Sequence, residues 1–188
     1  MMLTGLSARV NATNKHKAKR LALTIIALLI GGFLIAGTAG VRINASPSLP
    51  VGLYVSTGNT AGPLVEFCPS EPYASLAIRR GYRTKGSCPD GATPLLKSVI
   101  AAEGDIVAVS DAGISVNGLL IPNMRPRAVD TAGRPMPMWP TKTQRVQPGT
   151  IWVASNFSPR SFDSRYFGPI SMRSIRSRLR PLASPGTR

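Results

Sequence analysis

The chain has 188 residues and a formal net charge of +15, from 23 Lys and Arg against 8 Asp and Glu. With about 20 residues assigned to a membrane span, the remainder suits one compact domain and leaves no room for two. Excess positive charge is typical of nucleic-acid binding, but no RNA-binding motif or helix-turn-helix pattern accompanies it here, so no nucleic-acid partner is expected. A solvated surface, or contact with anionic lipid or an acidic partner, accounts for the charge.

An uncharged apolar stretch occupies residues 21–41 and is long enough to cross a hydrocarbon core of about 30 Å. The preceding residues, 1–20, carry five basic side chains and no acidic one. The positive-inside rule therefore places 1–20 in the cytoplasm and the chain after residue 41 in the periplasm or the exterior. A cleaved signal peptide is the alternative, but the apolar stretch is longer than the core of such a peptide. We expect a retained single-pass anchor.

The first exported segment, residues 51–55, has the composition of a β-strand. Residues 64–94 are predicted to form a separate insertion that covers one side of a cleft, with a short helix near residues 73–80. The insertion contains the only two cysteines, Cys68 and Cys88. An oxidising periplasm favours a disulfide between them, with unpaired thiols as the alternative. No metal site is expected, because two cysteines without a nearby histidine are an incomplete ligand set.

Residues 94–101 are dominated by Leu, Val and Ile, which favours a buried strand around Lys97. Asn117 and Gly118 are a strong signal for a two-residue hairpin turn. Further strands that form a β-meander are predicted at residues 106–110, 114–116 and 119–121.

Residues 122–148 are rich in Pro, Met and Arg and lack periodicity, which predicts a long loop or a mobile flap. Its larger apolar side chains are expected mainly to pack back onto the domain: Met124, Met136, Met138 and Trp139.

A strand at residues 151–154 follows, and the periplasmic domain is predicted to span residues 42–170. Residues 171–188 are predicted to form a basic tail, in which Pro181 and Pro185 discourage a long helix.

The exported region contains no histidine, because the only one in the chain, His16, precedes the anchor. A serine nucleophile there needs another base, and a lysine can serve if it is neutral at working pH. Burial lowers a lysine pKa, and Lys97 lies among apolar residues with no acid closer in sequence than Glu103. Ser48 and Lys97 are therefore candidates for nucleophile and base, although each alone also fits a structural role, in a turn or on an exposed strand face.

Three segments carry a joint pattern. Ser48 is followed by Pro50 just after the anchor, Lys97 is followed by Glu-Gly-Asp at 103–105, and residues 161–169 read Ser-Phe-Asp-Ser-Arg-Tyr-Phe-Gly-Pro. Together, in this order, they resemble the bacterial type I signal peptidase family and most closely its conjugative-transfer, TraF-type branch. The third segment matches the Ser-x-Asp-Ser-Arg box of that family.

Two departures distinguish the chain from general signal peptidases. Those enzymes have Ser-Met-x-Pro where residues 48–50 here read Ser-Leu-Pro, and Gly-Asp-Asn where residues 155–157 here read Ser-Asn-Phe. Both departures are similar to the TraF-type branch and argue against a general role in preprotein processing.

The resemblance implies that Ser48 is the nucleophile and Lys97 the general base. Ser46 matches the position whose hydroxyl joins the Ser48 backbone N–H in the oxyanion hole, and it is also the alternative nucleophile. Ser161 matches the position that hydrogen-bonds the lysine ammonium and orients it.

Asp163 and Arg165 match an ion pair that supports the site, and in the TraF-type branch the aspartate is additionally implicated in activity. A simple surface pair is the alternative interpretation of these two residues.

The fold implied by the resemblance is mostly β, with antiparallel sheets of the signal-peptidase type and one N-terminal transmembrane helix. The implied activity is that of a serine endopeptidase without cofactor or metal. Its implied substrate is a conjugative pilin precursor, which it processes for plasmid transfer by a type IV secretion system. The processing is either hydrolysis or cyclisation of the precursor. A general type I signal peptidase and a non-catalytic membrane component of the conjugation channel are the alternatives. The expected partners are the pilin precursor or another signal-peptide-bearing protein, the membrane, and other conjugation proteins.

Overall fold

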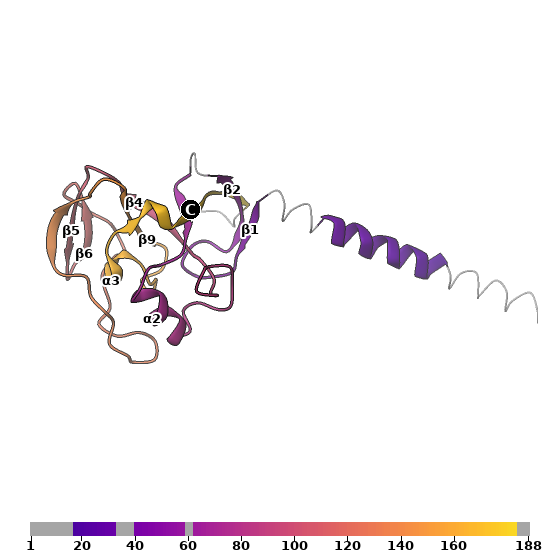
Figure 1. Cartoon of the computed structure of the whole chain (residues 1–188), viewed down its shortest axis with the longest axis horizontal. Helices are drawn as coiled ribbons and strands as arrows, with labels where there is room; N and C mark the ends of the chain where they lie inside the picture. The colour runs from indigo at the N-terminus through magenta and orange to yellow at the C-terminus, as the bar shows by residue number, and fades with distance from the viewer. Residues whose placement is uncertain (1–16, 33–39, 59–61, 184–188) are drawn as a thin grey trace, which may run out of the picture. The chain divides into compact units, whose positions relative to one another are not determined.

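The computed structural model divides the chain into two compact units, Met1–Val41 and Arg42–Arg188. Figure 1 shows the whole chain, of which the structure describes residues 17–32, 40–58 and 62–183.

Residues 17–32 of the first unit form a helix. Within the described ranges, no helix combines the length and the apolar character that crossing a membrane requires. The predicted anchor at 21–41 includes residues 33–39, which lie outside the described residues, so the anchor stays a prediction.

The second unit is built on a seven-stranded sheet with the order β1-β2-β11-β3-β4-β9-β10. The pairings recorded from β2 to β10 are all antiparallel, which confirms the mostly β, antiparallel part of the predicted fold class. Its strands are β1 (Val41–Asn44), β2 (Gly52–Gly58), β3 (Leu64–Phe67), β4 (Leu95–Ala101), β9 (Thr150–Ala154), β10 (Ile170–Ser171) and β11 (Ile175–Ala183).

A second, four-stranded sheet has the order β7-β6-β5-β8. Figure 1 shows β5 and β6 at the end of this unit opposite to β2. Asn117 and Gly118 join β6 to β7 with φ angles of 51° and 82°, which confirms the predicted hairpin turn. The strands are β5 (Ile106–Ser110), β6 (Gly113–Val116), β7 (Leu119–Leu120) and β8 (Lys142–Arg145).

The predicted loop at 122–148 needs a correction, because its last part is β8, which pairs with β5. Polar and basic residues form β8, so no apolar alternation marked it as a strand. Met124 is fully buried, and Met136 and Trp139 pack against apolar clusters of the domain, whereas Met138 is exposed. The loop is therefore held mainly by apolar packing, as predicted.

The interpretation of residues 64–94 as a separate insertion is also wrong in part. Its first strand, β3, lies inside the large sheet between β11 and β4. Beyond β3, the helix α2 (Tyr73–Arg79) confirms the predicted short helix. Cys68 and Cys88 form the predicted disulfide, 20 residues apart in sequence.

The largest correction concerns the predicted basic tail at 171–188. After the short helices α3 (Ser164–Phe167) and η1 (Met172–Ser174), the chain enters β11, which pairs with β2 on one side and β3 on the other. Arginines alternate with Ile175, Ser177 and Leu179 there, and the last two of these are buried. The arginines gave the segment the composition of a tail, while the alternation allows a strand.

A chain that ends after Ser174 is therefore expected not to fold, because β2 and β3 lose their shared partner and the apolar cluster of Leu49, Tyr54 and Leu64 loses Leu179. A chain that ends after Ala183 is the matched control. Near-ultraviolet circular dichroism and thermal unfolding measure the difference. Cooperative unfolding of the shorter chain would show that β11 is dispensable.

Candidate active site

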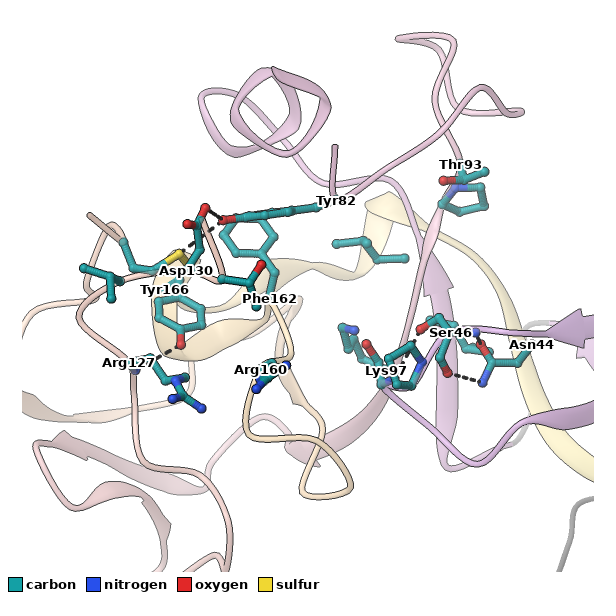
Figure 2. A pocket seen from close by; sticks show the side chains of 18 residues that line it. Asn44, Ser46, Tyr82, Thr93, Lys97, Arg127, Asp130, Arg160, Phe162 and Tyr166 are labelled. Carbon is teal, nitrogen blue, oxygen red and sulfur yellow. Dashed lines mark hydrogen bonds between the residues drawn. The ribbon is translucent and has the colours of Figure 1, made fainter. Parts of the chain in front are cut away.

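One cavity of about 610 Å³ brings together the serines that follow β1 and the lysine on β4 (Figure 2). Ser46 and Ser48 line it with Lys97, from segments about 50 residues apart in sequence. The rest of the wall comes from residues 82–96, from the 122–148 loop, and from α3 with the segment that precedes it. The lining residues there include Tyr82, Thr93, Pro94, Leu95, Leu96, Arg127, Val129, Asp130, Thr131, Met136, Arg160, Phe162 and Tyr166.

Asn44, at the end of β1, fixes the loop that carries the two serines. Its side-chain amide donates to the carbonyl oxygens of Ser46 at 3.0 Å, Leu49 at 3.1 Å and Pro50 at 3.1 Å. Its side-chain oxygen accepts the N–H of Ser46 at 3.2 Å. The sequence analysis missed this role, since the amide acts on backbone atoms that any sequence would offer.

Ser46 and Ser48 lie next to each other, as the predicted oxyanion hole requires. The backbone N–H of Ser48 donates to Ser46 Oγ at 3.2 Å. In this arrangement the Ser46 hydroxyl accepts from the Ser48 N–H, which is one of the two donors of the predicted oxyanion hole. Substrate binding would have to replace that contact for both groups to donate to one oxygen atom.

Lys97 is buried on β4, with 3 % of its surface exposed, as the apolar surroundings predicted. Burial lowers the pKa of Lys97 to about 8, because the ammonium form loses its solvation. The negative charge of Asp163 partly opposes this shift, and the positive charge of Arg165 adds to it. The lysine therefore has the lowered basicity that a general base near neutral pH needs.

Ser161 does not make the predicted hydrogen bond to Lys97. Its hydroxyl is buried and has no hydrogen-bond partner among the described residues. Arg165 binds Ser161 through the carbonyl oxygen instead, at 3.0 Å.

Asp163 and Arg165 form a fully buried bidentate ion pair, which excludes the alternative of a surface pair. The guanidinium donates from Nε to Asp163 Oδ1 and from a terminal nitrogen to Oδ2, both at 2.8 Å. The same guanidinium donates to the carbonyl oxygens of Ser158 and Pro159. These contacts fix the segment between β9 and α3 and satisfy the buried donors.

Ser155, which the sequence analysis did not select as a functional residue, connects this ion pair to Ser48. It is fully buried, and its N–H donates to Asp163 Oδ2 at 3.1 Å. Its hydroxyl donates to the carbonyl oxygen of Ser48. The only signal in the sequence was the departure at 155–157, where a serine replaces the glycine of general signal peptidases.

Across the described ranges, no three His, Cys, Asp or Glu side chains are grouped closely enough to hold a metal ion.

Comparisons with known proteins give the same family as the three motifs. The family model described as "Signal peptidase, peptidase S26" matches residues 15–182. Plasmid transfer protein TraF of Escherichia coli is 37 % identical over 170 residues, which cover 87 % of this chain and 96 % of that protein. Probable conjugal transfer protein TraF of Sinorhizobium fredii is 40 % identical over 154 residues, covering 78 % and 79 %.

Among solved structures, a signal peptidase I from Enterococcus faecalis aligns with 62 % of this chain and 92 % of its own, at 19 % identity and a TM-score of 0.35. The family match and the TraF relatives each span most of the sequence. The chain therefore belongs to the S26 signal peptidase family, in its TraF-type branch.

Proposed function

We propose that this protein is a membrane-anchored serine peptidase in which Ser48 is the nucleophile and Lys97 the general base. The observation that carries the proposal is the burial of Lys97 in the cavity that Ser48 also lines, with its pKa lowered to about 8. An ordinary lysine, with a pKa of about 10.4, is almost fully protonated at neutral pH. At a pKa of about 8, roughly a tenth of the lysine is neutral at pH 7 and can accept a proton.

The proposed substrate is a pilin precursor in conjugative transfer. Its support is the family branch, since the relatives are named as plasmid or conjugal transfer proteins. The proposed location is the bacterial inner membrane with the catalytic domain in the periplasm. This is supported by the apolar stretch at 21–41 and by the disulfide, which is typical of oxidising compartments.

In the proposed reaction, Ser48 Oγ attacks the scissile carbonyl carbon while Lys97 Nζ takes the hydroxyl proton. The oxyanion accepts hydrogen bonds from the Ser48 N–H and the Ser46 hydroxyl. Collapse of the tetrahedral intermediate breaks the C–N bond, and Lys97 returns the proton to the leaving amine. The acyl-enzyme is then released by water, or by the substrate's own amino terminus to give a cyclic product.

Replacing either dyad residue, by Ser48→Ala or Lys97→Ala, is expected to reduce processing by a factor on the order of 10⁴ or more, because nucleophile and base act as a unit. Ser46→Ala removes one oxyanion donor and is expected to cost roughly 10² to 10³ in kcat. Lys85→Ala, at an exposed lysine outside the cavity, is the matched control. Mass spectrometry of the precursor, co-expressed with each variant, measures processing.

The outcomes of these experiments distinguish the candidate functions. A product one water heavier than the cyclic mass indicates hydrolysis. Normal processing by Lys97→Ala would contradict the dyad and support a non-catalytic channel component. Cleavage of unrelated signal peptides would support a general signal peptidase.

The activity of the wild-type protein is expected to rise with pH to a midpoint near 8 and then to level off, because the neutral amine of Lys97 is the active form. Activity falls below this midpoint because protonation of Lys97 removes the base. Initial rates of kcat/KM across the pH range measure the profile. A midpoint near 10, the value of an unshifted lysine, would show that burial does not tune this residue.

Ser155→Ala is expected to reduce kcat roughly tenfold with little change in KM, because the Ser48 carbonyl loses its donor and the nucleophile segment loses its position. Ser75→Ala is the matched control, since this hydroxyl donates to Glu71 Oε1 at 2.7 Å and Ser75 does not line the cavity. Steady-state kinetics and the melting temperature separate the two roles. A lower melting temperature with unchanged kcat would assign Ser155 to folding alone.

A further inference from the structure

The cavity of Ser48 and Lys97 contains charged groups that the proposed reaction does not use. Besides Lys97, its charged lining residues are Arg127, Asp130 and Arg160. Figure 2 shows these side chains with Tyr82 and Tyr166. Two of the three unused charges are positive, so the charge that a substrate meets depends on what Asp130 contacts.

Asp130 is already neutralised within the protein. Its Oδ2 atom accepts from the Tyr82 hydroxyl at 2.5 Å and from Arg134 Nε at 2.7 Å, and Arg80 lies 3.7 Å away. The Tyr82 hydrogen bond, followed by those from Arg134 and Ala132, holds the pKa of Asp130 well below its usual range. A permanently charged carboxylate with two arginine partners adds little net charge to the cavity.

The charges of Arg127 and Arg160, unlike that of Asp130, are not neutralised by neighbouring side chains in the described part of the chain. Both are exposed, and neither guanidinium forms a hydrogen bond or ion pair with the residues that the structure describes. Their backbones are nevertheless held, because the N–H of Arg127 donates to the Tyr166 hydroxyl at 3.1 Å and that of Arg160 to Ser158 Oγ at 3.3 Å. Two anchored segments, far apart in sequence, thus present unpaired guanidinium groups to one cavity.

We propose that Arg127 and Arg160 form a subsite that binds a carboxylate of the substrate peptide. A planar guanidinium matches a carboxylate with two parallel hydrogen bonds, and two such groups can hold one carboxylate from both sides. This inference rests on the proposed function and adds a substrate class to it: a peptide with an acidic group close to the scissile bond.

The apolar part of the wall supports a peptide ligand over a small free anion. Leu95, Met136 and Phe162 line the same cavity as the two arginines and offer contacts for aliphatic or small side chains. The carboxylate itself has two possible sources, the side chain of Asp or Glu and the free carboxyl terminus of the substrate.

The test uses internally quenched peptides with alanine on both sides of the scissile bond. One Glu is moved through the neighbouring positions and compared with Gln at the same position, and a free carboxyl terminus is compared with its amide. Binding to the full-length Ser48→Ala protein is measured by fluorescence anisotropy, and cleavage by the wild-type protein is measured separately. At one position or at the terminus, the acidic peptide is expected to bind roughly tenfold more tightly, with a difference that added salt reduces.

Variants test whether the two arginines cause the preference for acidic peptides. The double change Arg127→Gln with Arg160→Gln is expected to remove the difference between acidic and neutral peptides. Arg125→Gln, at an exposed arginine of the same loop that does not line the cavity, is expected to retain it. Arg160→Glu is expected to reverse the preference toward a peptide with Lys in place of Glu.

The results of these binding and cleavage experiments test the subsite and the peptidase activity separately. Equal binding of acidic and neutral peptides, no detectable binding, or a preference that survives the double change overturns the inference. Cleavage of neutral peptides as fast as acidic ones also overturns it, while the proposed function stands. Selective binding of acidic peptides without any cleavage by the wild-type protein supports the subsite and contradicts the proposed peptidase activity.

Discussion

The buried ion pair between Asp163 and Arg165 connects the parts of the candidate active site. Neither side chain is exposed, and the guanidinium uses its remaining donors on carbonyl oxygens of the segment between β9 and α3. Because removing one partner of such a pair leaves an uncompensated buried charge, its loss typically costs about 3 to 5 kcal/mol. Through Ser155, the carboxylate also fixes the backbone of Ser48. The pair therefore acts on folding and on the position of Ser48 together.

The same carboxylate limits how far burial can change Lys97. Desolvation disfavours the ammonium form, whereas the negative charge of Asp163 favours it, and the neighbouring Arg165 offsets part of that attraction. With Asp163 alone, the lysine would remain more strongly basic, and with burial alone it would be less basic still. A pKa of about 8 results from the balance of these three effects, so the ion pair and the lysine have to be understood as one electrostatic unit.

The large sheet determines where these groups meet. The loop of Ser48 joins β1 to β2, while Lys97 lies on β4, and β11 and β3 occupy the positions between β2 and β4. The C-terminal strand thus sets the separation of the two strands that bring the serine and the lysine to one cavity. The walls from residues 82–96 and the 122–148 loop give the cavity its charge and shape.

The sequence by itself determined the family, which implied the mostly β class, and the Asn117-Gly118 turn, and it favoured the disulfide and a buried strand around Lys97, because each depends on local composition or on short motifs. Only the tertiary structure decided that residues 175–183 form a central strand, that Asn44 and Ser155 hold the segment of Ser48, and that Arg127 lines the cavity with Arg160. Ser155 and Ser48 are 107 residues apart, and their contact uses a backbone carbonyl that every residue has. Such long-range hydrogen bonds to the backbone leave no pattern in the sequence, because the fold alone brings the two groups together.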